Sequence, residues 1–145
     1  MLSQHFTLEE MIFSDTAVRL GLDNTPGEAE KEELYKLCEY ILEQVRMLVN
    51  APVHIISGYR SPKVNGNVPN SSDTSQHCKG QAADFRVKGY TTQELFDLIS
   101  NSSIRFDQLI QEYNSWVHIS RSDHPRRQRL YATRGVGGKP VYTPA

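Results

Sequence analysis

The longest amphipathic pattern in the chain runs from about residue 26 to residue 49. Its apolar positions recur at helical spacing, at Leu34, Leu37, Cys38, Ile41, Leu42, Val45 and Leu48. The stretch before it, Thr25-Pro26-Gly27-Glu28, has the form of a capping box with proline at the first helical position. The pattern therefore predicts one long helix that buries a single face.

Two further helices are predicted from similar start signals. Thr7-Leu8-Glu9-Glu10 and Thr91-Thr92-Gln93-Glu94 each place a glutamate three residues after a threonine, just before an apolar run. In this arrangement the hydroxyl accepts a backbone hydrogen bond and the carboxylate reaches back to the threonine N–H. We expect a short N-terminal helix and a helix of about ten residues after Thr91.

Short runs rich in β-branched and aromatic residues predict the strands. They cover residues 53–57, 81–87, 106–113, 116–120, 129–134 and 140–142. The run 81–87 alternates, which places Asp84 on the face opposite Phe85. Asn114-Ser115 indicates a hairpin turn between the middle pair, and a glycine-rich turn separates the last pair. Because helices precede and interrupt the strands without regular alternation, we expect an α+β fold with helices flanking a mostly antiparallel sheet.

The length of the chain favours a single domain. A chain of 145 residues can bury a real core, and it shows no repeat or linker, so we expect one domain over residues 1–145. Residues 61–76 are rich in Ser, Asn, Pro and Gly. We interpret this segment as a loop, too polar to pack, at the rim of a cleft.

Charge and composition exclude several classes of partner. With 16 basic and 17 acidic residues, the net charge of −1 gives no general attraction to nucleic acid or anionic membranes. No apolar run reaches membrane-spanning length, and the N-terminus lacks the features of a signal peptide. Cys38 and Cys78 are expected to be reduced, and the basic run from Arg121 to Arg134 to be a solvated face. We expect a monomer without nucleic-acid partners or membrane insertion.

The segment from Ser75 to Asp84 carries the most distinctive chemistry. His77 and Asp84 supply an imidazole and a carboxylate on a stretch otherwise rich in small residues, and Gly80 would let backbone and metal approach closely. These donors suit zinc, and a hydrolytic zinc requires three protein ligands and one open position. His118, in Trp116-Val117-His118, is the best third ligand. Cys78 would point away from His77 on an extended segment, and no ligand pattern surrounds the other histidines, His5, His54 and His124.

The pattern Ser-x-His-x-x-Gly-x-Ala-x-Asp, followed by Trp-x-His, resembles the zinc D-Ala-D-Ala carboxypeptidase family. That family includes VanX-type dipeptidases and phage L-alanyl-D-glutamate endopeptidases. The segment Ser57-Gly58-Tyr59-Arg60-Ser61-Pro62 is similar to its arginine segment. The resemblance implies a hedgehog/DD-peptidase-like fold and a zinc metallopeptidase acting on peptidoglycan peptides. It also implies Zn2+ ligation by His77, Asp84 and His118, with Arg60 near the scissile carbonyl and Ser75 and Arg60 contacting substrate.

The general base departs from the pattern of the family. VanX-type enzymes carry a glutamate three residues before the last histidine, where this chain has Ser115, which cannot deprotonate water at neutral pH. We take Glu112 as the substitute, because a three-residue loop between Tyr113 and Val117 would set Glu112 opposite His118. A two-residue loop would set it opposite Val117. Asp107 is the next choice.

Two biological settings follow from the resemblance and the missing export signal. One is a phage lysis or virion enzyme, made in the cytoplasm and acting at the bacterial cell wall after lysis or as a phage component. The other is a non-catalytic zinc-containing module that binds the cell wall or builds a virion. The departure at Ser115 keeps this alternative open.

Overall fold

Six strands form one sheet in the computed structural model, which describes residues 1–145. The strands are β1 (Val53–Ser57), β2 (Ala82–Val87), β3 (Gln108–Glu112), β4 (Trp116–Ser120), β5 (Gln128–Arg134) and β6 (Pro140–Pro144). Their order is β1-β2-β4-β3-β5-β6, and only β3 and β5 pair in parallel. The predicted α+β fold with a mostly antiparallel sheet is confirmed.

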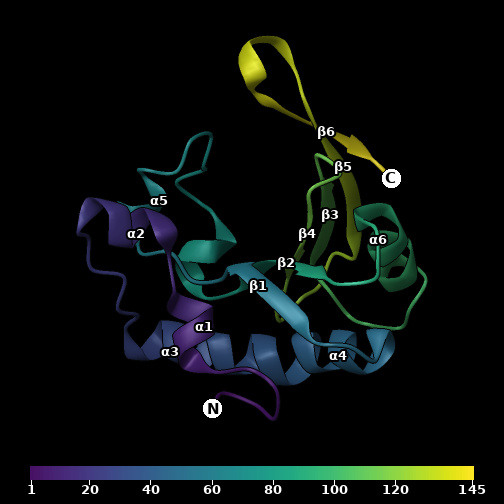
Figure 1. Cartoon of the computed structure of the whole chain (residues 1–145), viewed down its shortest axis with the longest axis horizontal. Coiled ribbons are helices and arrows are strands. Elements are labelled where there is room, and N and C mark those ends of the chain that lie inside the picture. The colour runs from purple at the N-terminus through teal and green to yellow at the C-terminus, as the bar shows by residue number, and fades with distance from the viewer.

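One continuous helical rod supports the sheet. It consists of α3 (Glu28–Leu37), the π-helical turn η1 (Cys38–Leu42) and α4 (Glu43–Val49), and Figure 1 shows it running along the base of the molecule. The other helical segments are α1 (Leu8–Ile12), α2 (Asp15–Leu20), α5 (Pro62–Asn65), η2 (Gln76–Lys79), α6 (Thr92–Ser100) and η3 (Val136–Gly138). No helix is long and apolar enough to cross a membrane.

The predicted long helix is present, but its predicted start is wrong. Gly27 is the N-cap and makes no side-chain capping bond. The backbone N–H and the hydroxyl of Thr25 instead donate to the Asp23 carboxylate, at 2.9 and 2.6 Å, so Thr25 closes a local turn. The capping boxes predicted at Thr7 and Thr91 are both present.

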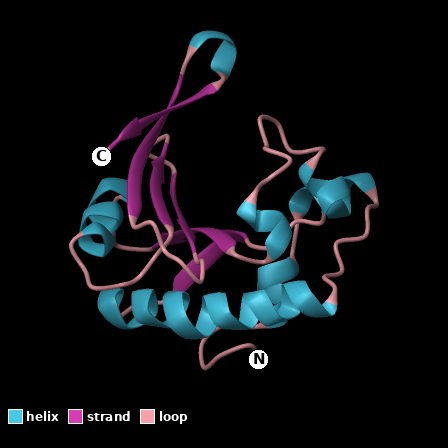
Figure 2. Cartoon of the chain, turned by 180° about the vertical axis from the view of Figure 1, so that it is seen from behind, coloured by secondary structure: helices cyan, strands magenta, loops and turns pink.

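The core lies on only one face of the sheet. The alternation of β2 turns Ala83 and Phe85 into the core, beside Leu34 and Val45 of the rod. Figure 2 shows α6 beside the strands on the side away from the loop that follows α5. Because helices cover one face, the opposite face of β2, β3 and β4 is free to carry polar side chains into a cleft.

Residues 61–76 are only partly the loop that their composition predicts. Ser61 caps α5 and Pro62 occupies its first turn, while Val64 and Asn65 are buried. The prediction that this segment is too polar to pack is therefore wrong for α5. Most of the polar residues after α5 do line the cleft, so the rim location is correct.

Gly80 connects the segment that carries His77 to the helical rod. It ends η2 in the left-handed region, at φ 72°. A Cβ at this position would lie 2.5 Å from the backbone carbonyl oxygen of Glu30 in α3. The glycine is therefore required by its backbone conformation and by the close approach of α3, whereas the sequence analysis assigned it to the approach of a metal.

Gly80→Ala should destabilise the fold more than the matched substitution Gly89→Ala. Both glycines have positive φ, but nothing lies within 4 Å of a Cβ at Gly89. We expect Gly89→Ala to lower the free energy of unfolding by about 1 kcal/mol through backbone strain alone, and Gly80→Ala by about 3 kcal/mol because α3 must also shift. Urea denaturation measures both values. Equal losses would contradict the close packing of η2 on α3.

Candidate metal centre

Asp84 and His118 face each other across two adjacent antiparallel strands. The register of β2 and β4 pairs Asp84 directly with His118. Directly opposed residues on one face have Cβ atoms about 5 Å apart. The side chains meet, and His118 Nδ1 lies 2.9 Å from Asp84 Oδ1. The pairing of β2 with β4 therefore builds this part of the site.

His77 reaches the same carboxylate from η2. The Ser75 hydroxyl accepts a hydrogen bond from the His77 backbone N–H at 3.2 Å and caps this short helix. The ring Nδ1 donates to the Gly58 carbonyl oxygen at 2.7 Å, because a carbonyl can only accept. The neutral ring then presents the lone pair of Nε2 toward Asp84 Oδ1, 3.4 Å away.

The three side chains fit a zinc ion. Ligand atoms of His77, Asp84 and His118 lie within 4.8 Å of one another, and all three residues are buried. Two imidazoles and a carboxylate form a donor set that zinc accepts. The lone pair of His77 Nε2 faces a carboxylate oxygen with no proton between them, and such an arrangement favours a cation at this point.

The electrostatics of the cluster follow from the buried Asp84. Burial lowers the pKa of His77, despite the nearby carboxylate. Burial also disfavours charge on His118, but the hydrogen bond and charge of Asp84 outweigh burial and raise its pKa. Burial opposes ionisation of Asp84 as well, yet the two imidazoles hold its pKa well below the usual range. The Asp84 carboxylate is therefore ionised at neutral pH.

Glu112 lies next to the cluster, although it lies opposite neither His118 nor Val117, so both predicted strand registers are wrong. It pairs with Trp116, and Ile110 is the residue opposite His118. Residues 113–115 form the turn, in which Tyr113 and Asn114 have positive φ. Glu112 and His118 still share a face because they are diagonal neighbours, and Glu112 Oε1 lies 3.8 Å from His118 Nδ1.

The environment of Glu112 favours a proton acceptor of moderate strength. Burial and the nearby Asp84 carboxylate raise the pKa of Glu112 to about 7. Ser115 contributes nothing to this site, because it lies in the turn and its carbonyl accepts a hydrogen bond from Arg86. Of the two residues, Glu112 is the one that lines the cleft.

A polar cleft of about 960 Å³ opens above the cluster. Arg60 and Ser75 line it, as do Glu112 and Trp116. The Arg60 Nε is buried and has no hydrogen-bond partner in the protein. An unpartnered buried donor is rare, and the place of this one in a cleft indicates a ligand that supplies an acceptor. Trp116, for which the sequence predicted no contact, pairs with Glu112 in the sheet, and its indole N–H lowers the pKa of that carboxyl against the larger effect of burial.

A family model described as Peptidase M15 matches residues 4–120. The chain belongs to the Peptidase M15 family. The resemblance to zinc peptidases of the VanX and D-Ala-D-Ala carboxypeptidase type is therefore confirmed. The observed fold is consistent with the hedgehog-like fold of that family. Curated proteins give no match to the chain.

The M15 match contains the cluster of His77, Asp84 and His118, and the residues that the sequence pattern excluded as ligands lie outside that cluster. His5 bonds to Glu43, and the grouped donors include neither His54 nor His124. Cys78 is also absent from the group, and both cysteines are free thiols. The structure thus brings together the three ligands that the motif predicts, and their zinc ligation stays a prediction.

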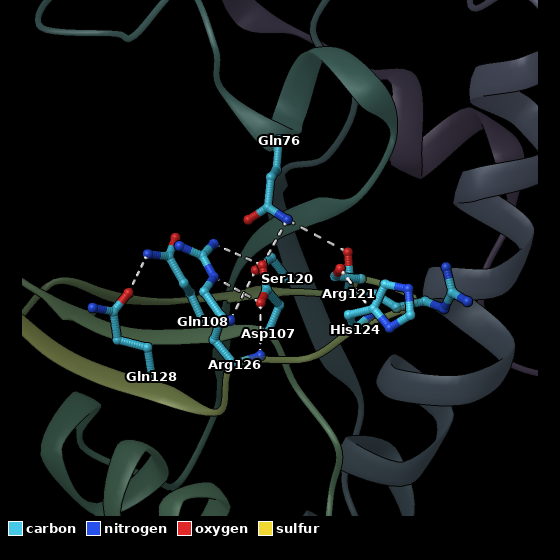
Figure 3. A network of polar contacts seen from close by, with 9 residues as sticks. Gln76, Asp107, Gln108, Ser120, Arg121, His124, Arg126 and Gln128 are labelled. Carbon is cyan, nitrogen blue, oxygen red and sulfur yellow. Dashed lines mark hydrogen bonds and ion pairs between the residues drawn. The ribbon is translucent and has the colours of Figure 1, made fainter.

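Asp107, the alternative base, is held in a structural clamp. Figure 3 shows its carboxylate between Gln76 and Arg126. Arg126 donates from its backbone N–H, Nε and Nη2 at 2.8 to 2.9 Å, and Gln76 donates at 3.0 Å. Asp107 therefore joins η2 to the start of β3 and to the segment before β5.

The basic run from Arg121 to Arg134 is not simply a solvated face. Arg121 pairs with Glu33 of the rod at 3.2 Å. Arg127 and Arg129 lie over the Phe106 ring, 5.0 and 5.1 Å from its centroid. Intramolecular contacts of these arginines therefore fix the path of the chain between β4 and β5.

Asp107→Asn should destabilise the protein in a pH-dependent way. Hydrogen bonds from Arg126 hold the pKa of this buried carboxyl below its usual range. We expect a loss of about 2 kcal/mol in the free energy of unfolding at pH 7. A lowered folded-state pKa gives stability that is complete above the unfolded pKa of ~3.9 and is lost as pH falls toward the folded value. The difference from wild type should therefore shrink below about pH 4.

Urea denaturation between pH 3 and pH 7 checks this result, with Asp123→Asn as the control. Asp123 also pairs with an arginine, Arg121, but its carboxylate is exposed. The control should unfold like wild type because exposed ion pairs contribute little. Equal effects of the two substitutions would show that the Asp107 clamp does not stabilise the fold.

Proposed function

We propose that the protein hydrolyses peptide bonds in the stem peptides of bacterial peptidoglycan, as a zinc-dependent enzyme. The observation that carries this proposal is the buried cluster of His77, Asp84 and His118, with Glu112 beside it in an open cleft. Membership in the Peptidase M15 family supports a metallopeptidase of this general kind. The alternative module without turnover would need the same ligands but no positioned carboxylate.

His77, Asp84 and His118 would hold the zinc. When bound, zinc lowers the pKa of water toward ~7 and polarises a carbonyl as a Lewis acid. Gly58 fixes the ring of His77 through its carbonyl, and the β2–β4 register fixes Asp84 against His118. These contacts orient the ligands before any substrate binds.

Glu112 would act as the general base and then as the general acid. Its carboxylate lies next to the cluster and takes a proton from the attacking water. The same group then returns the proton to the leaving amine. Its raised pKa suits both steps, since a pKa near the working pH gives an acceptor that also donates.

Arg60 would orient the peptide. Its Nε atom is buried in the cleft without a partner, so a peptide carbonyl oxygen would satisfy it. Arg60 would also stabilise negative charge that develops on the carbonyl oxygen at the scissile bond. Ser75 lines the same cleft, but its hydroxyl already caps η2. Its contribution to substrate binding would therefore be secondary to its structural role.

The cellular setting is a further part of the proposal. We propose a phage lysis or virion enzyme that acts as a monomer at the cell wall. The motif and the family support hydrolysis of peptidoglycan peptides, and we propose that the cleaved bond is either a terminal D-Ala linkage or an internal linkage such as L-Ala–D-Glu.

Incubation of the zinc-loaded protein with purified muropeptides tests the proposed function. Mass spectrometry should detect hydrolysis, with loss of terminal D-Ala for a carboxypeptidase or two internal fragments for an endopeptidase. A sample treated with a chelator and the His77→Ala variant serve as inactive controls. Binding of muropeptides without any change in mass would contradict the enzyme and support the non-catalytic module.

Glu112→Gln should reduce kcat by about 10²- to 10⁴-fold while zinc content stays unchanged. The substitution preserves size but removes the proton acceptor, and it should not destabilise a site that already disfavours charge. Steady-state assays on the muropeptide that wild type cleaves measure the effect. Asp107→Asn, assayed where it is folded, should retain most activity because Arg126 already binds that carboxylate. If Asp107→Asn loses activity while Glu112→Gln keeps most of it, the general base is Asp107.

A further inference from the structure

The C-terminal hairpin extends the cleft beyond the region that the family model matches. The match ends at Ser120, while β5 and β6 are formed by residues 128–144. β5 pairs with β3 and β6 pairs with β5, so the hairpin continues the face of the sheet that carries the metal cluster. Figure 1 shows this hairpin rising on one side of the molecule and the loop after α5 on the other.

An apolar row leads from the cluster into the hairpin. Ile110 lies opposite His118, Leu130 lies opposite Ile110, and Pro144 lies opposite Leu130. All of them line the cleft. Adjacent strands are about 4.8 Å apart, so the row covers about three strand spacings from β4 to β6. An extended peptide with its scissile bond at the cluster could therefore reach the hairpin with residues three to four positions away.

Arg134 is the unpaired cation on this side of the cleft. Three arginines and two carboxylates line the cleft, although the whole chain has a net charge of −1. Arg126 is paired with Asp107, whereas Arg60 and Arg134 form no ion pair. The guanidinium of Arg134 lies 4.2 Å from the centroid of the Tyr113 ring, which also lines the cleft.

The position of Arg134 suits a second contact with the substrate. In the strand order, the cluster on β2 and β4 lies between Arg60, which follows β1, and Arg134 on β5. A peptide that crosses the cluster would have one guanidinium on either side. Arg134 Nη1 donates to the Gly138 carbonyl oxygen at 3.4 Å, and this bond together with the Tyr113 contact restricts the side chain. The remaining N–H groups are left for an anion, a favourable arrangement for binding a carboxylate.

We propose that Arg134 binds a free carboxylate of the stem peptide, so that the C-terminal hairpin selects acidic peptides over amidated ones. This proposal rests on the proposed function, because it takes a stem peptide as the ligand. Stem peptides offer two sources of this group, the α-carboxylate of the glutamate and the C-terminal carboxylate. Amidation of each one in turn distinguishes them.

Calorimetric binding to the zinc-loaded Glu112→Gln protein tests the proposal without consuming the peptide. The ligands are one stem peptide and its two amides, one at the glutamate and one at the C-terminus. Adding Arg134→Gln should weaken binding of the free peptide by about tenfold, the loss of one charge-assisted contact. Amidation of the carboxylate that Arg134 contacts should weaken binding to the protein with Arg134 intact by the same tenfold. Arg134→Gln should not weaken the binding of that amide any further.

Arg105→Gln provides the matched control, because Arg105 is exposed and does not line the cleft. It removes the same charge and should leave all dissociation constants unchanged. Arg134→Lys should lose less affinity than Arg134→Gln, since it keeps the charge. Equal binding of all three peptides, or equal losses from Arg105→Gln and Arg134→Gln, would overturn the proposal.

The outcome is distinguishable from a failure of the proposed function. If wild type cleaves muropeptides but binding does not depend on Arg134, only the proposed role of the hairpin is wrong. If binding depends on Arg134 but wild type cleaves no muropeptide, the proposed hydrolase activity is wrong and the carboxylate site still stands.

Discussion

The buried carboxylate of Asp84 holds the two histidines of the site together. An ionised group at this depth requires partners, since an unpaired buried charge costs several kcal/mol. His118 lies opposite it in the sheet, and His77 reaches it from η2. Because Nδ1 of His77 donates to Gly58, the lone pair of Nε2 faces the carboxylate, a geometry that suits a cation between them. A zinc ion would be that cation.

The scaffold supports this cluster by keeping the hydrophobic core on the opposite face of the sheet. The helical rod and α6 cover one face of the sheet, which leaves the other face for polar side chains. Gly80 brings η2 against the backbone of α3, and Asp107 joins η2 to β3 and to the segment before β5. His77 is therefore held by contacts on both sides of η2. The C-terminal hairpin is connected to the same clamp through Arg126, so the cleft wall and the cluster share one support.

Much of this structure was predictable because its signals are local. The capping boxes at Thr7 and Thr91 each lie within four residues, and the motif from Ser75 to Asp84 lies within ten. The predictions were wrong where the structure is determined by contacts with distant residues or by competing contacts nearby. Asp23 binds Thr25 and moves the start of the long helix to Glu28. The partners of the basic run, such as Glu33 for Arg121, lie far away in the sequence.

The site shows the same division between local and distant information. The grouping of His77, Asp84 and His118 could be predicted because each of them lies in a compact motif. The registers considered for Glu112 failed because the turn places positive φ at both Tyr113 and Asn114, which no strand pattern reveals. The three-residue loop still put Glu112 on the face of His118. The unpartnered Arg60 Nε could not be predicted, since the absence of a partner becomes visible only when all neighbours are placed.

Zinc content decides whether His77, Asp84 and His118 form a metal centre. Purified protein, reconstituted with zinc and dialysed, should contain about one equivalent by elemental mass spectrometry, as a three-ligand site requires. His77→Ala and His118→Ala, checked for folding by circular dichroism, should lose most of that zinc, while Glu112→Gln should retain it. Less than about half an equivalent in wild type, or undiminished zinc in folded His77→Ala, would contradict the proposed metal centre.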